Sequence, residues 1–382
     1  MRRWARRVGA AIGAVALSFA TGCGSFWVYP GSSSSGTSAT GNYVYVANQL
    51  TDNIGAYAIG TGTLTAVSGS PFALGYAPTA AVVTPANTFL YVGSTSNIYA
   101  YSIGSGGALT LVNGSLTGSA VGTSNVVSMA VSPDGGWLLS LDGNDATIEE
   151  FQINQTTGTL TLEATPAYTT LITSGSVGAS AIAIAPNGQY GYIALGTAGE
   201  LVFTFATSTG VLAFQGVQVY PGTGTADNGL AVNPASSELY VARSGTYGGL
   251  VEFSIGINGA LTLVSTTPVT SISSATPQPY AVAVNNAGTS VFVANRLDGS
   301  ISGFSIASTG ALTALAGSPF KTGTAVSSLA MDQTGAYLLA SAFSGNPDLS
   351  MYSFGSTGAL DYSAVAATGT DPTDAVAVAT TR

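Results

Sequence analysis

Histidine is absent from this 382-residue chain, and cysteine occurs once, at Cys23. Without histidine the chain cannot build a His-ligated zinc site and lacks the commonest general base at neutral pH. With a single cysteine there is no internal disulfide. The sequence also has no phosphate-binding loop, no Ser-His-Asp set and no dinucleotide-binding glycine pattern. These absences exclude most familiar catalytic and cofactor sites.

Charged side chains are scarce, at 7% of the residues, and basic ones are the rarer, with 8 Lys and Arg against 17 Asp and Glu. Four arginines lie within the first seven residues, so the chain beyond residue 22 keeps four basic residues against 17 acidic ones, a net charge of −13. Nucleic-acid binding requires a basic patch, which four cations cannot form. We therefore expect neither nucleic acid nor an anionic lipid surface as a partner of the domain.

The N-terminus combines a basic start, a short apolar stretch and small residues. Arg2, Arg3, Arg6 and Arg7 precede the apolar run of residues 8–20, and Ala20-Thr21-Gly22 leads to Cys23. This order predicts a secretory signal peptide over residues 1–22, because the apolar run is too short to span a bilayer. The site resembles a bacterial lipobox, with Ala20 in place of the usual Leu, so that Cys23 would be acylated. The alternative is a plain signal peptide with an incidental cysteine.

Residues 23–41 are predicted to form a lipid-anchored flexible linker, since residues 31–38 consist only of Gly, Ser and Thr. Two acyl chains on Cys23 would hold the protein stably on a membrane. Gly24, rather than an aspartate, follows the cysteine, which favours the outer membrane. We expect an exported, membrane-anchored lipoprotein of the cell envelope, on the periplasmic side or at the cell surface.

Residues 42–382 repeat one unit seven times. Each unit has an Ala/Val-rich strand, a turn, a Tyr-Val-type strand, a polar loop, an alternating strand and a segment of the Gly-Ala-Leu-Thr type. The first strands end at Val83, Val131, Ile184, Val232, Val284, Met331 and Val378. Four short strands per unit of this length are typical of propeller blades. We predict an all-β, seven-bladed β-propeller with four antiparallel strands per blade.

The order of strands at the two ends predicts how the ring closes. The repeat region begins with a second-type strand, residues 42–48, and ends with a first-type strand, residues 374–379. The C-terminal strand should therefore join the N-terminal strands in one blade and leave no open edge.

Several segments resemble a known family. Tyr43–Asn48 (YVYVAN), Val291–Asn295 (VFVAN) and the Gly-Ser-Pro-Phe segments at 69–72 and 317–320 are similar to those of the lactonase-type seven-bladed propellers. That family includes one kind of 6-phosphogluconolactonase, and the segments also resemble YVTN-type surface repeats. The resemblance covers the domain and implies the propeller fold and hydrolysis of a lactone ring. These segments are strand and turn residues, so they specify the fold far better than the activity.

Polar residues at the ends of second strands and between blades should meet on one face of the ring. Arg243 and Arg296 end second strands in consecutive blades, so we expect them near one another at the channel mouth. In a lactonase they would stabilise the oxyanion, with Asp227 or Asp298 as the base that activates water. The alternative is that each arginine pairs with a neighbouring aspartate on a solvated rim.

Three further aspartates, Asp52, Asp142 and Asp145, fall in the same class of loop. Asp142-Gly143-Asn144-Asp145 offers the oxygen ligands that Ca²⁺ or Mg²⁺ prefers, although a polar turn is the alternative interpretation. We assign no metal site and no cofactor from the sequence.

Two function classes remain open. The missing histidine, the few cations and the Ser/Thr-rich composition favour a binding or interaction module whose channel mouth takes a protein, a glycan or a small neutral or weakly anionic ligand. The family resemblance and the placement of Arg243 and Arg296 favour a lactonase, a carboxylic ester hydrolase. A self-associating surface layer is a third class that the low charge permits, but a monomer is expected.

Overall fold

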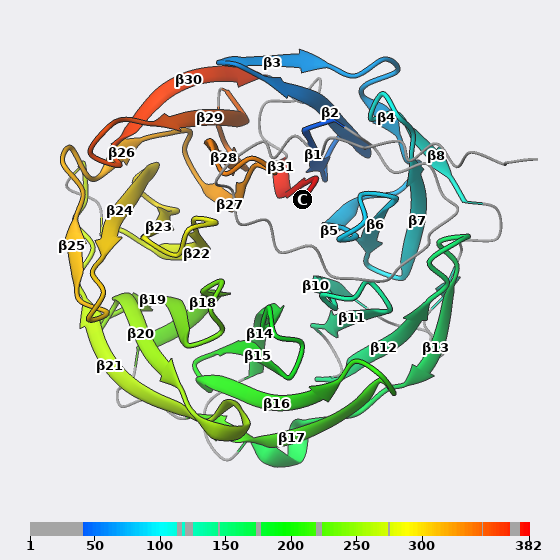
Figure 1. The fold of residues 1–382 in the computed structure, drawn as a ribbon, viewed down its shortest axis with the longest axis horizontal. Helices are drawn as coiled ribbons and strands as arrows, with labels where there is room; N and C mark the ends of the chain where they lie inside the picture. Colours follow the sequence, from blue (N-terminus) through cyan, green and yellow to red (C-terminus); the bar gives the residue numbers. More distant parts are fainter. Residues whose placement is uncertain are drawn as a thin grey trace, which may run out of the picture. The chain divides into compact units, whose positions relative to one another are not determined.

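The repeated unit forms seven four-stranded blades around a common centre (Figure 1). The structure is a computed structural model that describes residues 41–112, 117–118, 125–143, 146–172, 177–218, 224–273, 276–345, 347–366 and 375–382. All of these lie in one unit, Ser34–Arg382. The predicted signal peptide, Cys23 and all of the linker except Gly41 lie outside the described residues.

Strands at equivalent positions of the blades share a place in the ring. The innermost strands, in blades 1 to 7, are β31 (Ala375–Thr380), β5 (Pro78–Val83), β10 (Val126–Val131), β14 (Val177–Ile184), β18 (Thr225–Val232), β22 (Pro279–Val284) and β27 (Val326–Met331). The second strands are β1 (Tyr43–Asn48), β6 (Phe89–Ser94), β11 (Trp137–Asp142), β15 (Tyr190–Gly196), β19 (Glu238–Gly245), β23 (Ser290–Asn295) and β28 (Tyr337–Ala342).

The outer half of each blade follows the same order. The third strands are β2 (Asn53–Gly60), β7 (Asn97–Ile103), β12 (Ile148–Ile153), β16 (Glu200–Ala206), β20 (Gly249–Ile255), β24 (Ser300–Ile306) and β29 (Leu349–Phe354). The outermost strands are β3 (Thr63–Ala66), β8 (Leu109–Leu111), β13 (Leu160–Ala164), β17 (Val211–Gln218), β21 (Leu261–Thr267), β25 (Leu312–Ala314) and β30 (Leu360–Ala366). The predicted fold, with four antiparallel strands in each of seven blades, is confirmed.

Some short elements were not predicted. The two-residue strands β4 (Phe72–Ala73), β9 (Thr117–Gly118) and β26 (Phe320–Lys321) pair with the third strands β2, β7 and β24. Two 3₁₀ turns, η1 (Thr169–Leu171) and η2 (Ile257–Gly259), lie in connections. These elements are too short to show a hydrophobic period, which is the signal used to find strands from sequence.

The ring closes between the two ends of the described chain. β31 pairs with β1, with Val44 opposite Thr380 and Val46 opposite Val378. Beyond this ladder, the Tyr43 backbone N–H donates to Thr381 Oγ1 over 2.8 Å. This is the predicted closure, in which the C-terminal strand supplies the inner strand of the first blade and pairs the inner edge of β1.

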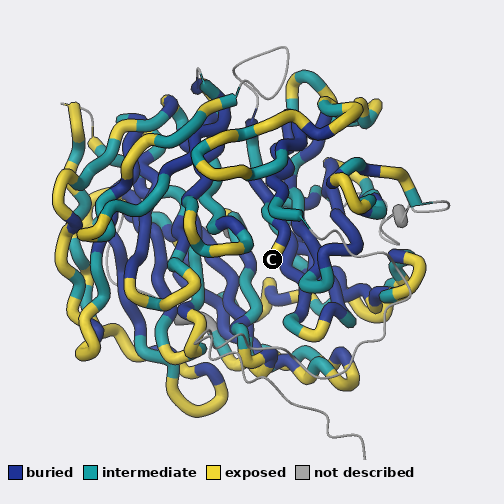
Figure 2. Tube along the Cα trace, turned by 45° about the horizontal axis from the view of Figure 1, so that its top comes forward, coloured by how far each residue is buried: buried dark blue, intermediate teal, exposed yellow. Residues whose placement is uncertain are grey.

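The hydrophobic core consists of seven clusters, and each cluster lies between two adjacent blades. The second strands supply much of it, and Figure 2 shows buried residues concentrated in the strands and exposed ones in loops and outer strands. Buried tyrosines also connect the blades. The hydroxyls of Tyr45, Tyr91 and Tyr192 donate to glycine carbonyl oxygens of the next blade. Each blade is thus stabilised mainly by its two neighbours.

Candidate functional site

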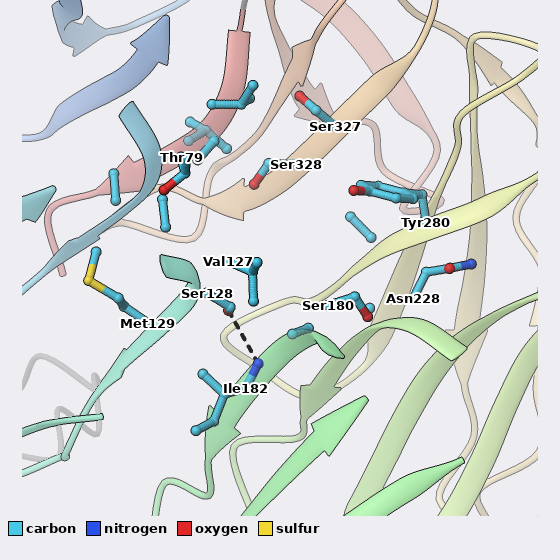
Figure 3. A pocket seen from close by; sticks show the side chains of 18 of the residues that line it. Thr79, Val127, Ser128, Met129, Ser180, Ile182, Asn228, Tyr280, Ser327 and Ser328 are labelled. Carbon is cyan, nitrogen blue, oxygen red and sulfur yellow. Dashed lines mark hydrogen bonds between the residues drawn. The ribbon is translucent and has the colours of Figure 1, made fainter. Parts of the chain in front are cut away.

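The innermost strands enclose a cavity of about 690 Å³ on the axis of the ring. All seven inner strands contribute to its wall, together with three residues that directly follow second strands, namely Gln49, Arg296 and Phe343. Its polar side chains are mostly hydroxyls and amides. Figure 3 shows Thr79, Ser128, Ser180, Asn228, Tyr280 and Ser328 around it.

A bulge near the start of each inner strand positions part of this lining. In six of the strands one extra residue faces the second strand, and in β14 the irregularity lies between Val177 and Ala181. A bulged residue leaves the regular ladder, so its side chain is re-aimed. The cavity-lining residues at these bulges, called here the bulge residues, are Thr79, Val127, Ser180, Asn228, Tyr280, Ser327 and Val376.

Four bulge residues link consecutive blades through their side chains. Thr79 Oγ1 donates to the Val126 carbonyl oxygen, and Ser180 Oγ donates to that of Asp227 over 3.2 Å. Asn228 Nδ2 and Ser327 Oγ donate in the same way to the next blade, to Pro279 O at 2.8 Å and Ala375 O at 2.7 Å. These bonds hold the polar wall of the cavity in a defined geometry.

Arg296 is the one charged residue among the described residues that line the cavity. It follows the last residue of β23, and its guanidinium lies over the ring of Tyr280 at 4.4 Å from the ring centre. Its backbone is fixed as well, because its N–H donates to Gln278 O over 2.8 Å and its carbonyl accepts from Ala325 N over 3.1 Å. Within the described part of the chain, Arg296 makes no ion pair.

Arg243 does not join Arg296 at the cavity. Its side chain is buried, with Nε at 2.6 Å from Asp227 Oδ1 and Nη2 at 2.9 Å from Asp227 Oδ2, and Nη2 also lies 3.1 Å from Glu200 Oε1. The expected meeting of the two arginines at the channel mouth is therefore wrong. For Arg243, pairing with Asp227 matches the alternative interpretation, although the pair is buried rather than on a solvated rim.

A one-residue offset explains this difference. Arg243 lies opposite Asp227 in the ladder, and the residue at the same place in the next blade is Asn295, opposite Pro279. Arg296 is one residue further along. Successive side chains of a strand point to opposite faces, so a shift of one residue sends the two arginines in different directions.

The carboxyl of Glu200 completes the buried cluster and was not among the predicted residues. Burial raises the pKa of Glu200 well above its ordinary value, and the charge of Asp227 and a hydrogen bond to it add to this, while Arg243 opposes it. The sequence held a signal for this residue. Glu200 faces Ala194 at a place where the other six third strands have Ile or Leu, namely Ile54, Ile98, Ile148, Leu250, Ile301 and Leu349.

Three other predicted aspartates, Asp52, Asp142 and Asp298, do not line the cavity. Asp298 accepts hydrogen bonds from Ser300 Oγ at 2.8 Å and from the Ile272 backbone N–H at 3.1 Å, so it organises its turn and does not pair with Arg296. Asp52 is exposed in a turn with φ of 51°. Asp142 is buried at the end of β11, and Asp145 lies outside the described residues.

The described residues contain no group of three or more His, Cys, Asp or Glu arranged to hold a metal ion. Part of the Asp142–Asp145 loop lies outside these residues. No helix in the described ranges has the length and apolarity to cross a membrane.

Tyr280 is the functional candidate that the sequence analysis missed. It stands in Pro279–Val284 (PYAVAV), at the position where the other bulge residues are Thr, Val, Ser or Asn. An aromatic residue among small ones at one place of a repeat is a signal that alignment of the seven units could have found.

Comparison with known proteins identifies the fold. No family model matches the chain, and no curated protein matches its sequence. A structure from Bacteroides uniformis, provisionally named a 6-phosphogluconolactonase, has a TM-score of 0.70 at 17% identity and covers 89% of this chain and 99% of its own. The periplasmic gluconolactonase PpgL of Pseudomonas aeruginosa has a TM-score of 0.69 at 15% identity, with 89% and 99% covered.

The same fold also occurs in a protein with an unrelated name. The Cps50 (Swd1) β-propeller domain of Myceliophteria thermophila has a TM-score of 0.53 at 12% identity and covers 76% of this chain and 86% of its own. At these identities the likeness concerns architecture, because one fold supports many functions. The chain is a β-propeller, and among these three structures the two most similar to it carry lactonase names.

Proposed function

We propose that the protein binds a small hydroxylated carboxylate, or the lactone formed from it, in its central cavity, with Arg296 as the anchoring cation. The position of Arg296 supports this most directly. It lines the cavity, stacks on Tyr280 and makes no ion pair with a described residue. A guanidinium binds a carboxylate through two parallel hydrogen bonds.

The rest of the wall suits the hydroxyl groups of such a ligand. The lining includes Gln49, Ser128, Asn228 and Ser328, whose side chains donate and accept hydrogen bonds. A second negative charge would meet no second cation in the described lining, and Arg243 is already bound to Asp227 and Glu200. We therefore favour a monoanionic carboxylate, or the lactone formed from it, over a phosphorylated ligand.

Hydrolysis of the lactone is the second candidate, and the comparisons support it more directly than they support a purely binding module. Two of the similar structures are named for lactonase activity. Arg296 would stabilise the oxyanion that forms when water attacks the carbonyl carbon. The described lining has no carboxylate that could act as the general base. Asp227 instead binds Arg243, and Asp298 accepts a hydrogen bond from Ser300.

The test combines binding and turnover. Purified residues 24–382 are titrated calorimetrically with D-gluconate and with neutral D-glucose, and hydrolysis of D-glucono-1,5-lactone and 6-phosphogluconolactone is followed by pH-stat. We expect saturable binding of gluconate and none of glucose. Turnover above the spontaneous rate would establish the hydrolase, whereas no binding of gluconate and no turnover would overturn the proposal.

We also propose that the protein acts at the cell envelope, tethered through an acylated Cys23. The support is the order of basic, apolar and small residues before that cysteine. Expression of the full chain in a bacterium with radiolabelled palmitate, beside Cys23→Ala, tests it. Label in the wild type alone is expected, and an unlabelled, cleaved wild type would indicate a plain signal peptide.

A further inference from the structure

Three residues at one end of the central cavity lie together on one side of the ring. Gln49, Arg296 and Phe343 each follow a second strand, and each lines the cavity. They belong to blades 1, 6 and 7, which are consecutive because blade 7 lies between blades 6 and 1 (Figure 1). We call these three residues the mouth sector. The residues at the same place in blades 2 to 5 are small and do not line the cavity, namely Thr95, Gly143, Gly196 and Ser244.

Phe343 takes no part in the hydrophobic core of the described chain. It is half-buried, and it neither belongs to any of the seven core clusters nor packs against one. Removing apolar surface from water is favourable, so an aromatic side chain at a cavity wall offers a surface that a ligand can cover. Phe343 supplies this surface in the mouth sector.

The backbone fixes Phe343 beside Arg296. The Ala325 N–H donates to the Arg296 carbonyl oxygen over 3.1 Å, and the Phe343 N–H donates to the Ala325 carbonyl oxygen over 2.9 Å. Ala325 has a φ of 56°, in the left-handed region that residues other than glycine rarely adopt. Such a conformation persists only where the surrounding structure holds it. Ala325 therefore ties the cation of blade 6 to the aromatic ring of blade 7.

Gln49 completes the mouth sector on the other side of Phe343. Its amide can both donate and accept hydrogen bonds, and it makes none with another described residue through its side chain. Around this part of the mouth a cation, an aromatic ring and an amide thus follow one another in consecutive blades.

We propose that the ligand is a sugar ring that carries the carboxylate, a hexuronic acid in its pyranose form, an inference that rests on the proposed binding of a hydroxylated carboxylate. Arg296 binds the carboxylate, Phe343 stacks on the C–H face of the ring, and Gln49 binds a hydroxyl on the far side. The face of an aromatic ring is negative and attracts the partially positive C–H hydrogens of a pyranose. An open-chain sugar acid has no such face.

The rest of the wall favours a hydroxylated ring over an apolar one. Ser128, Asn228 and Ser328 also line the cavity, and their side chains can bind sugar hydroxyls. The volume of about 690 Å³ exceeds that of one monosaccharide. The ring can therefore come from a free sugar acid or from the end of a glycan, and both share the pyranose with its carboxylate.

Calorimetric titration of purified residues 24–382 separates the ring from the charge. D-glucuronate has both, D-gluconate has the carboxylate without the ring, and D-glucose has the ring without the carboxylate. We expect D-glucuronate to bind about three- to tenfold more tightly than D-gluconate, and D-glucose not to bind. The methyl β-glycoside of D-glucuronate distinguishes the two sources, because retained affinity indicates a glycan end and lost affinity indicates the free sugar acid.

Four variants test the mouth sector. Phe343→Leu should reduce the ratio of the two affinities, D-glucuronate over D-gluconate, towards one, whereas a purely structural effect would lower both affinities equally. Tyr362→Leu removes an aromatic ring outside the cavity and should leave the ratio unchanged. Ala325→Val opposes the φ of 56° and should weaken the binding of both sugar acids, and Ala325→Gly should restore it. Thermal melting confirms that each variant folds.

Two results would contradict the ring-form ligand. Equal affinities of the wild type for D-glucuronate and D-gluconate, or an unchanged ratio in Phe343→Leu, would overturn it while leaving carboxylate binding by Arg296 in place. Binding of neither sugar acid would instead overturn the proposed function on which this inference rests, and the inference with it.

Discussion

The guanidinium of Arg296 lies 4.4 Å from the centre of the Tyr280 ring, so the charged group at the central cavity rests on the aromatic residue at the bulge of β22. A cation over an aromatic face is stabilised by the ring quadrupole and is held in place by it. The bulge in β22 thus positions the Tyr280 ring, and the ring in turn holds the guanidinium of Arg296.

Replacing Tyr280 with leucine should weaken the binding of a carboxylate ligand without abolishing it. Arg296 would keep its charge but lose the contact with the aromatic ring. This loss corresponds to an affinity about three- to tenfold lower. Calorimetric titration with D-gluconate measures this. Tyr362→Leu, on the outermost strand of blade 7, removes a tyrosine away from the cavity and should leave the affinity unchanged. Equal effects of the two substitutions would contradict the role of Tyr280.

Arg243→Met should destabilise the fold. Asp227 and Glu200, both fully buried, would lose their shared cation, which typically costs about 3–5 kcal/mol. Denaturant unfolding measures the difference. Lys321→Met, which removes an exposed cation, should change stability by less than about 0.5 kcal/mol. Similar stabilities of the two variants would show that the buried cluster contributes little.

The stability of the protein should depend on pH through Glu150. Burial, with a smaller contribution from the charge of Glu163, raises the pKa of Glu150 from 4.5 to about 7. A carboxyl with a raised folded-state pKa adds stability that is complete below pH 4.5 and is lost as the pH rises through 7. Glu150→Gln should therefore lose less free energy of unfolding than the wild type between these pH values. Glu163→Gln should have a smaller effect, and parallel curves for wild type and Glu150→Gln would contradict the assignment.

Ring closure should be essential for cooperative folding. Ending the chain at residue 374 removes β31 and exposes the inner edge of β1, which would be free to pair with other chains. We expect loss of a single cooperative transition in calorimetry and a rise in aggregation. A milder variant, Thr381→Val, removes the side-chain bond to the Tyr43 N–H and should cost about 1 kcal/mol. A truncated protein that melts like the full chain would refute the closure argument.

The sequence predicted the architecture well because each blade repeats a period-two pattern and a turn. The inner strands end where expected at Val83, Val131 and Val284, and the closing strand was inferred from strand order alone. Short strands such as β4 and β26 were missed, since two residues show no period.

The site was harder to predict because it depends on register at single-residue resolution. Arg243 and Arg296 looked equivalent, but Arg296 lies one residue beyond the position that matches Arg243, and that offset separates a buried ion pair from a cavity-lining cation. The bulges have no pattern of their own in hydropathy. Only comparison of the seven units, position by position, would have singled out Tyr280 and Glu200.

Carboxylate binding by Arg296 can be tested in a single titration. The dissociation constant of D-gluconate is measured for the wild type, for Arg296→Gln and for Lys321→Gln, which removes a cation outside the cavity. Loss of a hydrogen bond between charged groups corresponds to about tenfold or more in affinity. We expect that loss for Arg296→Gln and none for Lys321→Gln. Equal affinity of the wild type and Arg296→Gln would contradict it.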